Sequence, residues 1–210
     1  MYMNNQEKRK KLGFLKGSIQ EYIYLSYLYL LILGTLSYSI YYAFLGINII
    51  NYSNLLDILL SPIVIITKDI MTPIAMGVYI VSGVLLFLFL EKRTKKSLQN
   101  NIPAEKEIKL QKQYQSFKNA KFLIPIIGTF AFYLGYAIGG GYKLNNRIQT
   151  GDFEVNRLIE FSNGETQEVK LLGLNNQYIF YVHKGEKQVI TAPISGNIKR
   201  IKKIKKSNKE

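Results

Sequence analysis

Few side chains in this sequence have the types and spacing that catalysis or metal binding needs. Cysteine is absent, which excludes disulfides, thiol catalysis and Cys-ligated metal sites. His183 is the only histidine, and we interpret it as a solvent-facing residue at a strand end rather than as a catalytic base. No P-loop, zinc-protease or nucleophile-elbow motif (G-x-x-x-x-G-K, H-E-x-x-H, G-x-S-x-G) is present. The sequence therefore predicts a non-enzymatic protein without a cofactor or metal.

Three small residues recur at a spacing of four in the last apolar segment: Ala131, Gly135 and Gly139. On a helix this spacing places them on one face, where small side chains let two backbones approach closely. We expect this face to pack against another helix, either within the chain or between subunits. A channel-lining role for the glycine run is the alternative.

Basic residues are the other recurrent feature, with 28 Lys and Arg against 14 Asp and Glu and a net charge of +14. Clustered cations beside apolar segments are attracted to anionic lipid headgroups. The residues that we expect to contact headgroups are Lys92, Arg93, Lys95, Lys96, Lys202, Lys203, Lys205 and Lys206. Such clusters also bind nucleic acid. Isoleucine at every third position of the C-terminal cluster fits a lipid surface or simple solvation instead, so nucleic acid is the less favoured partner.

The elements that must position these residues begin with three uncharged apolar segments, 22–46, 72–90 and 122–142. About 20 apolar residues cross a bilayer, so each segment predicts a transmembrane helix. Residues 55–66 are too short to cross and predict an interfacial or re-entrant helix. We expect Asn54 to cap it and Pro62 to break or kink it. Residues 22–90 then form a transmembrane hairpin that contains this short helix.

The first span carries a stripe of tyrosines that also includes a glycine. Its members recur at spacings of three and four: Tyr24, Tyr27, Leu31, Gly34, Tyr38 and Tyr41. We interpret the stripe as helix packing combined with aromatic belts at the membrane interfaces. A polar path for a substrate is the alternative.

The distribution of positive charge predicts the orientation in the membrane. Residues 1–21 and the predicted linker helix 91–121 are basic, and basic segments flanking membrane helices stay in the cytoplasm. Three crossings of the cell membrane then leave the C-terminal domain on the non-cytoplasmic side. The basic tail 205–210 argues for the opposite side, but charges far from a membrane helix count weakly.

The C-terminal residues 152–204 change from helical periodicity to alternation. Strands are expected at 153–161, 167–174, 178–183, 188–192 and 198–204, with turn residues between them. The order of strands and turns, ending in a Pro-Ile turn and a short closing strand, resembles the small barrels of the SH3-like and Sm-like families. The predicted fold is thus an α+β membrane protein with a small antiparallel β-barrel domain. Sm-like barrels form rings and bind RNA, but no ring-pairing or base-stacking signature carries either property to this chain.

Two functions are consistent with this organisation. The favoured one is a membrane-anchored interaction or sensor module that assembles through its helices and binds a partner through the β domain. The partners would be anionic lipid together with a second copy of the chain or another membrane protein. The alternative is an oligomeric pore or membrane-disrupting subunit, for example of a stress or phage-defence system. The spans contain no ionisable residue, which argues against ion-coupled transport.

Overall fold

The described part of the chain contains three long helices, shorter helical segments and one antiparallel sheet. A computed structural model describes residues 18–68, 70–98, 108–112, 114–115 and 123–204. Three helices, as predicted, are long and apolar enough to cross a membrane: α2 (Ile19–Ala43), α4 (Met71–Leu98) and α6 (Leu123–Thr150).

Helix α2 has well-defined signals at both ends. The Ser18 side chain caps its first turn by accepting a hydrogen bond from the Glu21 amide, 3.4 Å away. Its last turn closes at Gly46, whose φ of +74° lies in the left-handed region that favours glycine. The chain then forms a single turn of 3₁₀-helix, η2 (Ile49–Tyr52), before the next helix begins.

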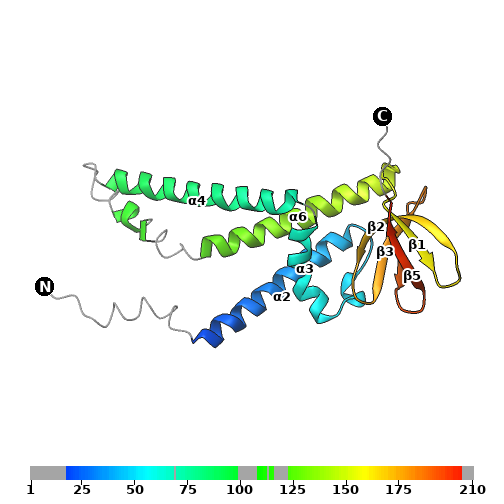
Figure 1. The fold of residues 1–210 in the computed structure, drawn as a ribbon. Helices are drawn as coiled ribbons and strands as arrows, with labels where there is room; N and C mark the ends of the chain where they lie inside the picture. The colour runs from blue at the N-terminus through cyan, green and yellow to red at the C-terminus, as the bar shows by residue number, and fades with distance from the viewer. Residues whose placement is uncertain (1–17, 69, 99–107, 113, 116–122, 205–210) are drawn as a thin grey trace.

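Helix α3 (Leu55–Thr67) is the short apolar helix that the sequence predicts. Asn54 caps it in a reciprocal capping box with Asp57. Pro62 lies inside the helix, and of the two expected effects, a break and a kink, the structure rules out the break. The carbonyl of Ile58, which loses its amide partner at Pro62, accepts a hydrogen bond from Ser61 Oγ at 2.8 Å instead. In Figure 1, α3 runs across the long helices rather than alongside them.

Helix α6 extends past the predicted end of its span. It passes through Gly139, Gly140 and Gly141 without interruption and continues from residue 142 to Thr150. This last part is polar, but its Ile148 is fully buried against the sheet. Gly151, with a φ of +75°, ends the helix. Packing against the sheet therefore keeps residues 142–150 helical, although their hydropathy does not predict a membrane-spanning segment.

Helix α4 continues beyond its apolar part, so the basic residues Lys92 to Lys96 are helical. Within the predicted linker helix 91–121, residues 108–112 and 114–115 are also helical. The remainder of that linker after Leu98, the first seventeen residues of the predicted N-terminal segment and the tail 205–210 lie outside the described residues.

Five strands follow α6: β1 (Arg157–Phe161), β2 (Thr166–Leu174), β3 (Tyr178–His183), β4 (Ile190–Pro193) and β5 (Ile198–Lys203). All pairs are antiparallel, in the order β4-β3-β2-β1-β5. β4 and β5 are the two edges, so strand pairing does not close the sheet into the expected barrel. The edges differ in protection, because β4 is short and ends in Pro193 while β5 carries lysines and an arginine.

Strand β3 is buried on both faces of the sheet. Ile179 and Tyr181 point into the sheet's own core, with Ile159, Val169 and Ala192. Phe180 and Val182 point the other way and pack against the helices. This two-sided burial explains the nearly continuous apolar sequence of β3.

The arrangement of the helices is asymmetric (Figure 1). α2 and α6 converge on the sheet, whereas the N-terminal end of α2, the C-terminal end of α4 and the N-terminal end of α6 lie away from it. Three crossings of one bilayer would therefore place the sheet opposite the start of α2. None of the residues in the most apolar window of α4 is buried within the chain.

Candidate functional site

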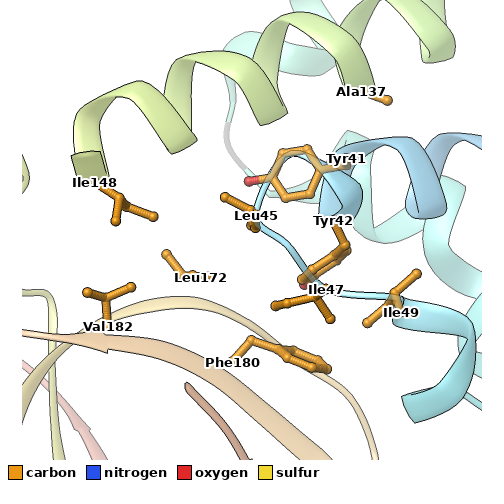
Figure 2. Close-up of a cluster of buried hydrophobic side chains, with 10 residues drawn as sticks. All are labelled: Tyr41, Tyr42, Leu45, Ile47, Ile49, Ala137, Ile148, Leu172, Phe180 and Val182. Atoms are coloured by element: carbon orange, nitrogen blue, oxygen red, sulfur yellow. The ribbon is translucent and has the colours of Figure 1, made fainter. Parts of the chain in front are cut away.

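A shared hydrophobic core joins the helices to the sheet, and we call it the junction core (Figure 2). Its buried side chains come from the end of α2, the following loop, α6 and strands β2 and β3: Tyr41, Tyr42, Leu45, Ile47, Ile49, Ala137, Ile148, Leu172, Phe180 and Val182. The Tyr42 ring lies at its centre, 5.2 Å from the ring centroid of Phe180. The sheet domain is therefore docked on the ends of two helices that are long and apolar enough to cross a membrane.

Gly173 makes the close approach of Tyr42 to the sheet possible. The register of β2 against β3 shifts between Leu171 and Gly173, which marks a β-bulge. A Cβ atom at Gly173 would collide with the Tyr42 hydroxyl. The bulge at Gly173 therefore leaves room for the tyrosine of a distant helix.

The loop between α2 and α3 is attached to the same side of the sheet. The Asn175 side-chain amide donates a hydrogen bond to the Tyr52 carbonyl at 2.7 Å. The Tyr52 ring lies edge-on to Tyr178, with centroids 5.2 Å apart. The loop, both long helices and the sheet thus form one packed unit.

A polar cleft of about 730 Å³ opens beside this unit, and we call it the amide cleft. Five amide side chains line it, from the α2–α3 loop, the end of α6 and the segment before β4: Asn48, Asn51, Asn145, Gln149 and Gln188. Each amide both donates and accepts hydrogen bonds. Tyr52 and Thr191 add an aromatic ring and a hydroxyl, and Lys187 is the one charged side chain among the described residues that line the cleft. The cleft suits an uncharged polar ligand surface.

A second close approach joins α2 to α3. A Cβ atom at Gly34 would collide with the backbone carbonyl of Ile58 and lie 2.9 Å from Ser61 Oγ. The Tyr133 hydroxyl of α6 donates a hydrogen bond to the Pro62 carbonyl at 3.0 Å. Gly34 belongs to the tyrosine stripe of α2. The C-terminal half of the stripe, from Gly34 to Tyr41, packs within the chain, whereas Tyr24 in the N-terminal half is two-thirds exposed.

The predicted helix-packing residues Ala131, Gly135 and Gly139 do not form a close helix–helix contact within the described part of the chain. Ala131 is exposed, and a Cβ atom added at Gly135 or Gly139 would meet no described atom within 4 Å. The close contacts within the chain involve Gly34 and Gly141 instead. Ala131 and Gly135 line an open groove of about 510 Å³ between α4 and α6. Packing of this face between subunits stays a prediction.

The predicted headgroup contacts fall at opposite ends of the helices. Lys92, Arg93, Lys95 and Lys96 are exposed at the end of α4 that lies away from the sheet (Figure 1). Lys202 and Lys203 are exposed on β5. Lys205 and Lys206 lie outside the described residues.

The outer face of β1 and β5 carries a small ion-pair cluster. Glu160 lies 3.0 Å from Lys199 Nζ and 3.9 Å from Arg200 Nε. The hydrogen bond from Lys199, with the surrounding positive charges, holds the pKa of the Glu160 carboxyl below its usual value of 4.5. These partners neutralise part of the basic character of β5.

His183 ends β3, and its ring lies edge-on to Tyr181 with centroids 5.2 Å apart. Among the described residues, no group of three His, Asp or Glu side chains lies close enough to hold a metal ion. Arg157 and Lys68, which the sequence did not single out, approach one cavity between the helices and the sheet.

Comparison of the chain with protein-family models, with curated proteins and with solved structures finds no match.

The junction core is the main feature that sequence reasoning missed. The Tyr42–Phe180 contact joins residues far apart in the chain, and neither periodicity nor hydropathy reports such a pair. Two local signals were present. Gly173 interrupts a strand, and Asn48 and Asn51 make an otherwise apolar loop polar.

Proposed function

We propose that the protein is a non-enzymatic, membrane-anchored interaction or sensor module, in which the sheet domain binds a partner and the helices respond or assemble. The junction core carries this proposal, because it makes the sheet and two membrane helices one packed body. A partner held by the sheet would act on α2 and α6 directly, without a flexible linker between them.

The amide cleft is the proposed partner-binding surface. Its walls come from the α2–α3 loop, from α6 and from the segment that leads into β4. One bound partner would therefore touch both the sheet and the helices. Edge strand β4 borders the cleft and offers unpaired backbone groups to an extended segment of the partner.

The sheet domain itself is proposed to be a small barrel-like module of the SH3-like or Sm-like kind. Two observations support this proposal. β5 returns to pair with β1, and a single tight turn around Gly196 joins β4 to β5. The apolar side chains on the face of the sheet that lies away from the helices form a separate core.

The exposed face of α6 supports the proposal that the protein assembles through this helix. Ala131, Gly135 and Gly139 are exposed, and Ala75 of α4 lines the same groove as Ala131 and Gly135. A helix from a second copy of the chain, or from another membrane protein, would fit against such a face. The exposed basic ends of α4 and β5 are proposed to contact anionic lipid headgroups.

Affinity purification of the full-length protein in mild detergent tests the module. Partner recovery and the mass of the assembly should both be measured. We expect the double variant Asn51→Ala/Gln149→Ala to lose the partner, because it removes two amides of the cleft. Gln177→Ala, in the exposed β2–β3 turn, is the matched control and should keep it.

Reconstitution separates this function from the pore alternative. The module predicts that liposomes containing the protein stay impermeable to ions. If they conduct, and if Gly135→Leu abolishes both conductance and assembly, the interaction module is wrong and the pore is supported.

The proposed orientation in the cell membrane, with a cytoplasmic N-terminus, rests on the positive charge of the predicted cytoplasmic segments. Because the chain lacks Cys, an introduced thiol is unique. In intact cells a membrane-impermeant maleimide should label Asn163→Cys, in the β1–β2 turn, but not Lys95→Cys at the end of α4. The reverse pattern would place the sheet domain in the cytoplasm.

A further inference from the structure

A second hollow lies where the membrane helices meet the sheet, separate from the amide cleft. Its volume is about 560 Å³, and its walls come from the ends of α2 and α3, from Tyr136 of α6 and from β2. The polar and charged residues that line it are Tyr38, Tyr41, Thr67, Lys68, Asn156 and Arg157.

Two cations approach this hollow from different elements. Lys68 Nζ lies 3.1 Å from the Tyr41 hydroxyl and 5.0 Å from the centre of its ring, so it is held at the rim. Arg157 donates a hydrogen bond from Nη1 to the Asn156 carbonyl at 2.8 Å. A guanidinium has five N–H donors, arranged to hold a phosphate or carboxylate at two points. No acidic side chain lines the hollow among the described residues.

The positions of these residues in the chain place the hollow at a membrane surface. Lys68 is the first charged residue after the apolar stretch of α3, Tyr41 lies near the end of α2, and Arg157 begins β1. Tyrosines and long cationic side chains at the ends of apolar segments reach the headgroup layer. With the three helices crossing a bilayer as proposed above, the hollow would lie at the depth of lipid phosphates.

The remaining wall is apolar and continues outward. Val64 and Ile65 of α3 line the hollow together with Leu171 and Leu172 of the sheet. On the surface of α3, Ile63 and Val64 are more than half exposed. A helix that crosses the bundle with an exposed apolar face fits the boundary between headgroups and acyl chains.

We propose that this hollow is a binding site for one anionic phospholipid. Arg157 and Lys68 hold the phosphate, the hydroxyls of Tyr38 and Tyr41 contact the headgroup, and an acyl chain lies along Val64 and the exposed face of α3. The site goes beyond the proposed partner binding and makes no use of the amide cleft. It differs from the basic clusters at Lys92 to Lys96 and on β5, because it pairs two cations with an apolar wall inside a cavity.

Binding of short-chain lipids to the delipidated full-length protein in mild detergent tests the site. We expect dioctanoyl-phosphatidylglycerol to bind about tenfold more tightly than dioctanoyl-phosphatidylcholine, because only the first is a net anion. One charge-assisted contact is worth about this factor. Inorganic phosphate at the same concentration should bind far more weakly, because it cannot use the apolar wall.

Substitutions at the two cations give the decisive comparison. Arg157→Gln and Lys68→Gln should each weaken phosphatidylglycerol binding about tenfold, whereas Lys143→Gln, an exposed control on α6, should leave it unchanged. Arg157→Lys keeps the charge but loses the planar donor group, and it should give an intermediate loss; it carries the test if Arg157→Gln does not fold. Melting without lipid checks the fold of each variant.

Three results would overturn the proposal. Equal binding of the two lipids would remove the anionic selectivity. Phosphate binding as tight as that of phosphatidylglycerol would make the hollow a soluble-anion site. An equal loss in Lys143→Gln would show a general effect of surface charge.

Discussion

Gly173 shows how one residue sets the distance between a membrane helix and a sheet. Its missing side chain leaves space for the Tyr42 hydroxyl, and the tyrosine ring fills the junction core. Because Tyr42 is packed between Tyr38 and Phe180, it has little room to move away. The contact between Gly173 and Tyr42 therefore limits how α2 can pack against the sheet.

Gly173→Ala is expected to lower the free energy of unfolding by about 1–3 kcal/mol, the usual cost of inserting an atom into a packed interior. Thermal unfolding in detergent, followed by circular dichroism, measures the change. Tyr42→Phe removes the atom that the new methyl group meets, so the double variant should recover part of the loss. Strictly additive effects of the two substitutions would contradict the contact.

Glu160 predicts a pH dependence at the sheet surface. Its folded pKa is depressed by Lys199, so the ion pair stabilises the fold above pH 4.5, and this contribution is lost as the pH falls through the folded pKa. We expect a small difference in melting temperature between the wild type and Glu160→Gln at neutral pH, shrinking in acid. Glu165→Gln, in the exposed β1–β2 turn, is the control. A difference that grows in acid would contradict the sign of the shift.

At the scale of elements, the crossing of α2 and α3 fixes the position of the short helix. Because Gly34 has no side chain, α2 can approach the Ile58 carbonyl of α3. The Ser61 hydroxyl donates a hydrogen bond to that same carbonyl, which lacks its usual amide partner at Pro62. The proline is therefore tolerated where its missing amide is compensated. Tyr133 completes the contact from α6.

Gly34→Ala should separate α2 from α3, because its methyl group meets backbone rather than a movable side chain. We expect a loss of about 1–3 kcal/mol in stability, although alanine favours the helical state more than glycine does. Gly83→Ala in α4, which meets open space, is the matched control and should be neutral or stabilising. If both variants melt alike, the crossing is not a tight contact.

The elements themselves were largely predictable from the sequence. The three spans and the strands follow from uninterrupted apolar stretches and from alternation between turns, which are local signals. β1 begins at Arg157 rather than at residue 153, since the chain first turns at Gly151. The helical end of α6 was not predictable, because it depends on contacts with distant segments. For the same reason the sequence predicted Ala131, Gly135 and Gly139 as a packing face but could not identify what they face.

At the scale of the whole molecule, the junction core predicts that the sheet and the ends of α2 and α6 open together. Phe180→Ala should cost about 3–5 kcal/mol and raise hydrogen exchange at the C-terminal end of α2 as well as in β3. Ile179→Ala, the neighbouring residue on the opposite face of β3, tests the sheet's own core. Faster exchange in the sheet with an unchanged α2 in the Phe180→Ala variant would show that the two parts open independently.

In a bilayer crossed by α6, the uninterrupted course of this helix to the sheet would let it act as a rigid lever. Its 28 residues measure about 42 Å at 1.5 Å per residue. A bilayer that thins or thickens changes the tilt of the helices that span it. A tilt change of about 10° would move the far end of a helix this long by about 7 Å. The sheet, fixed to that end by Ile148, would sweep across the membrane surface by the same distance.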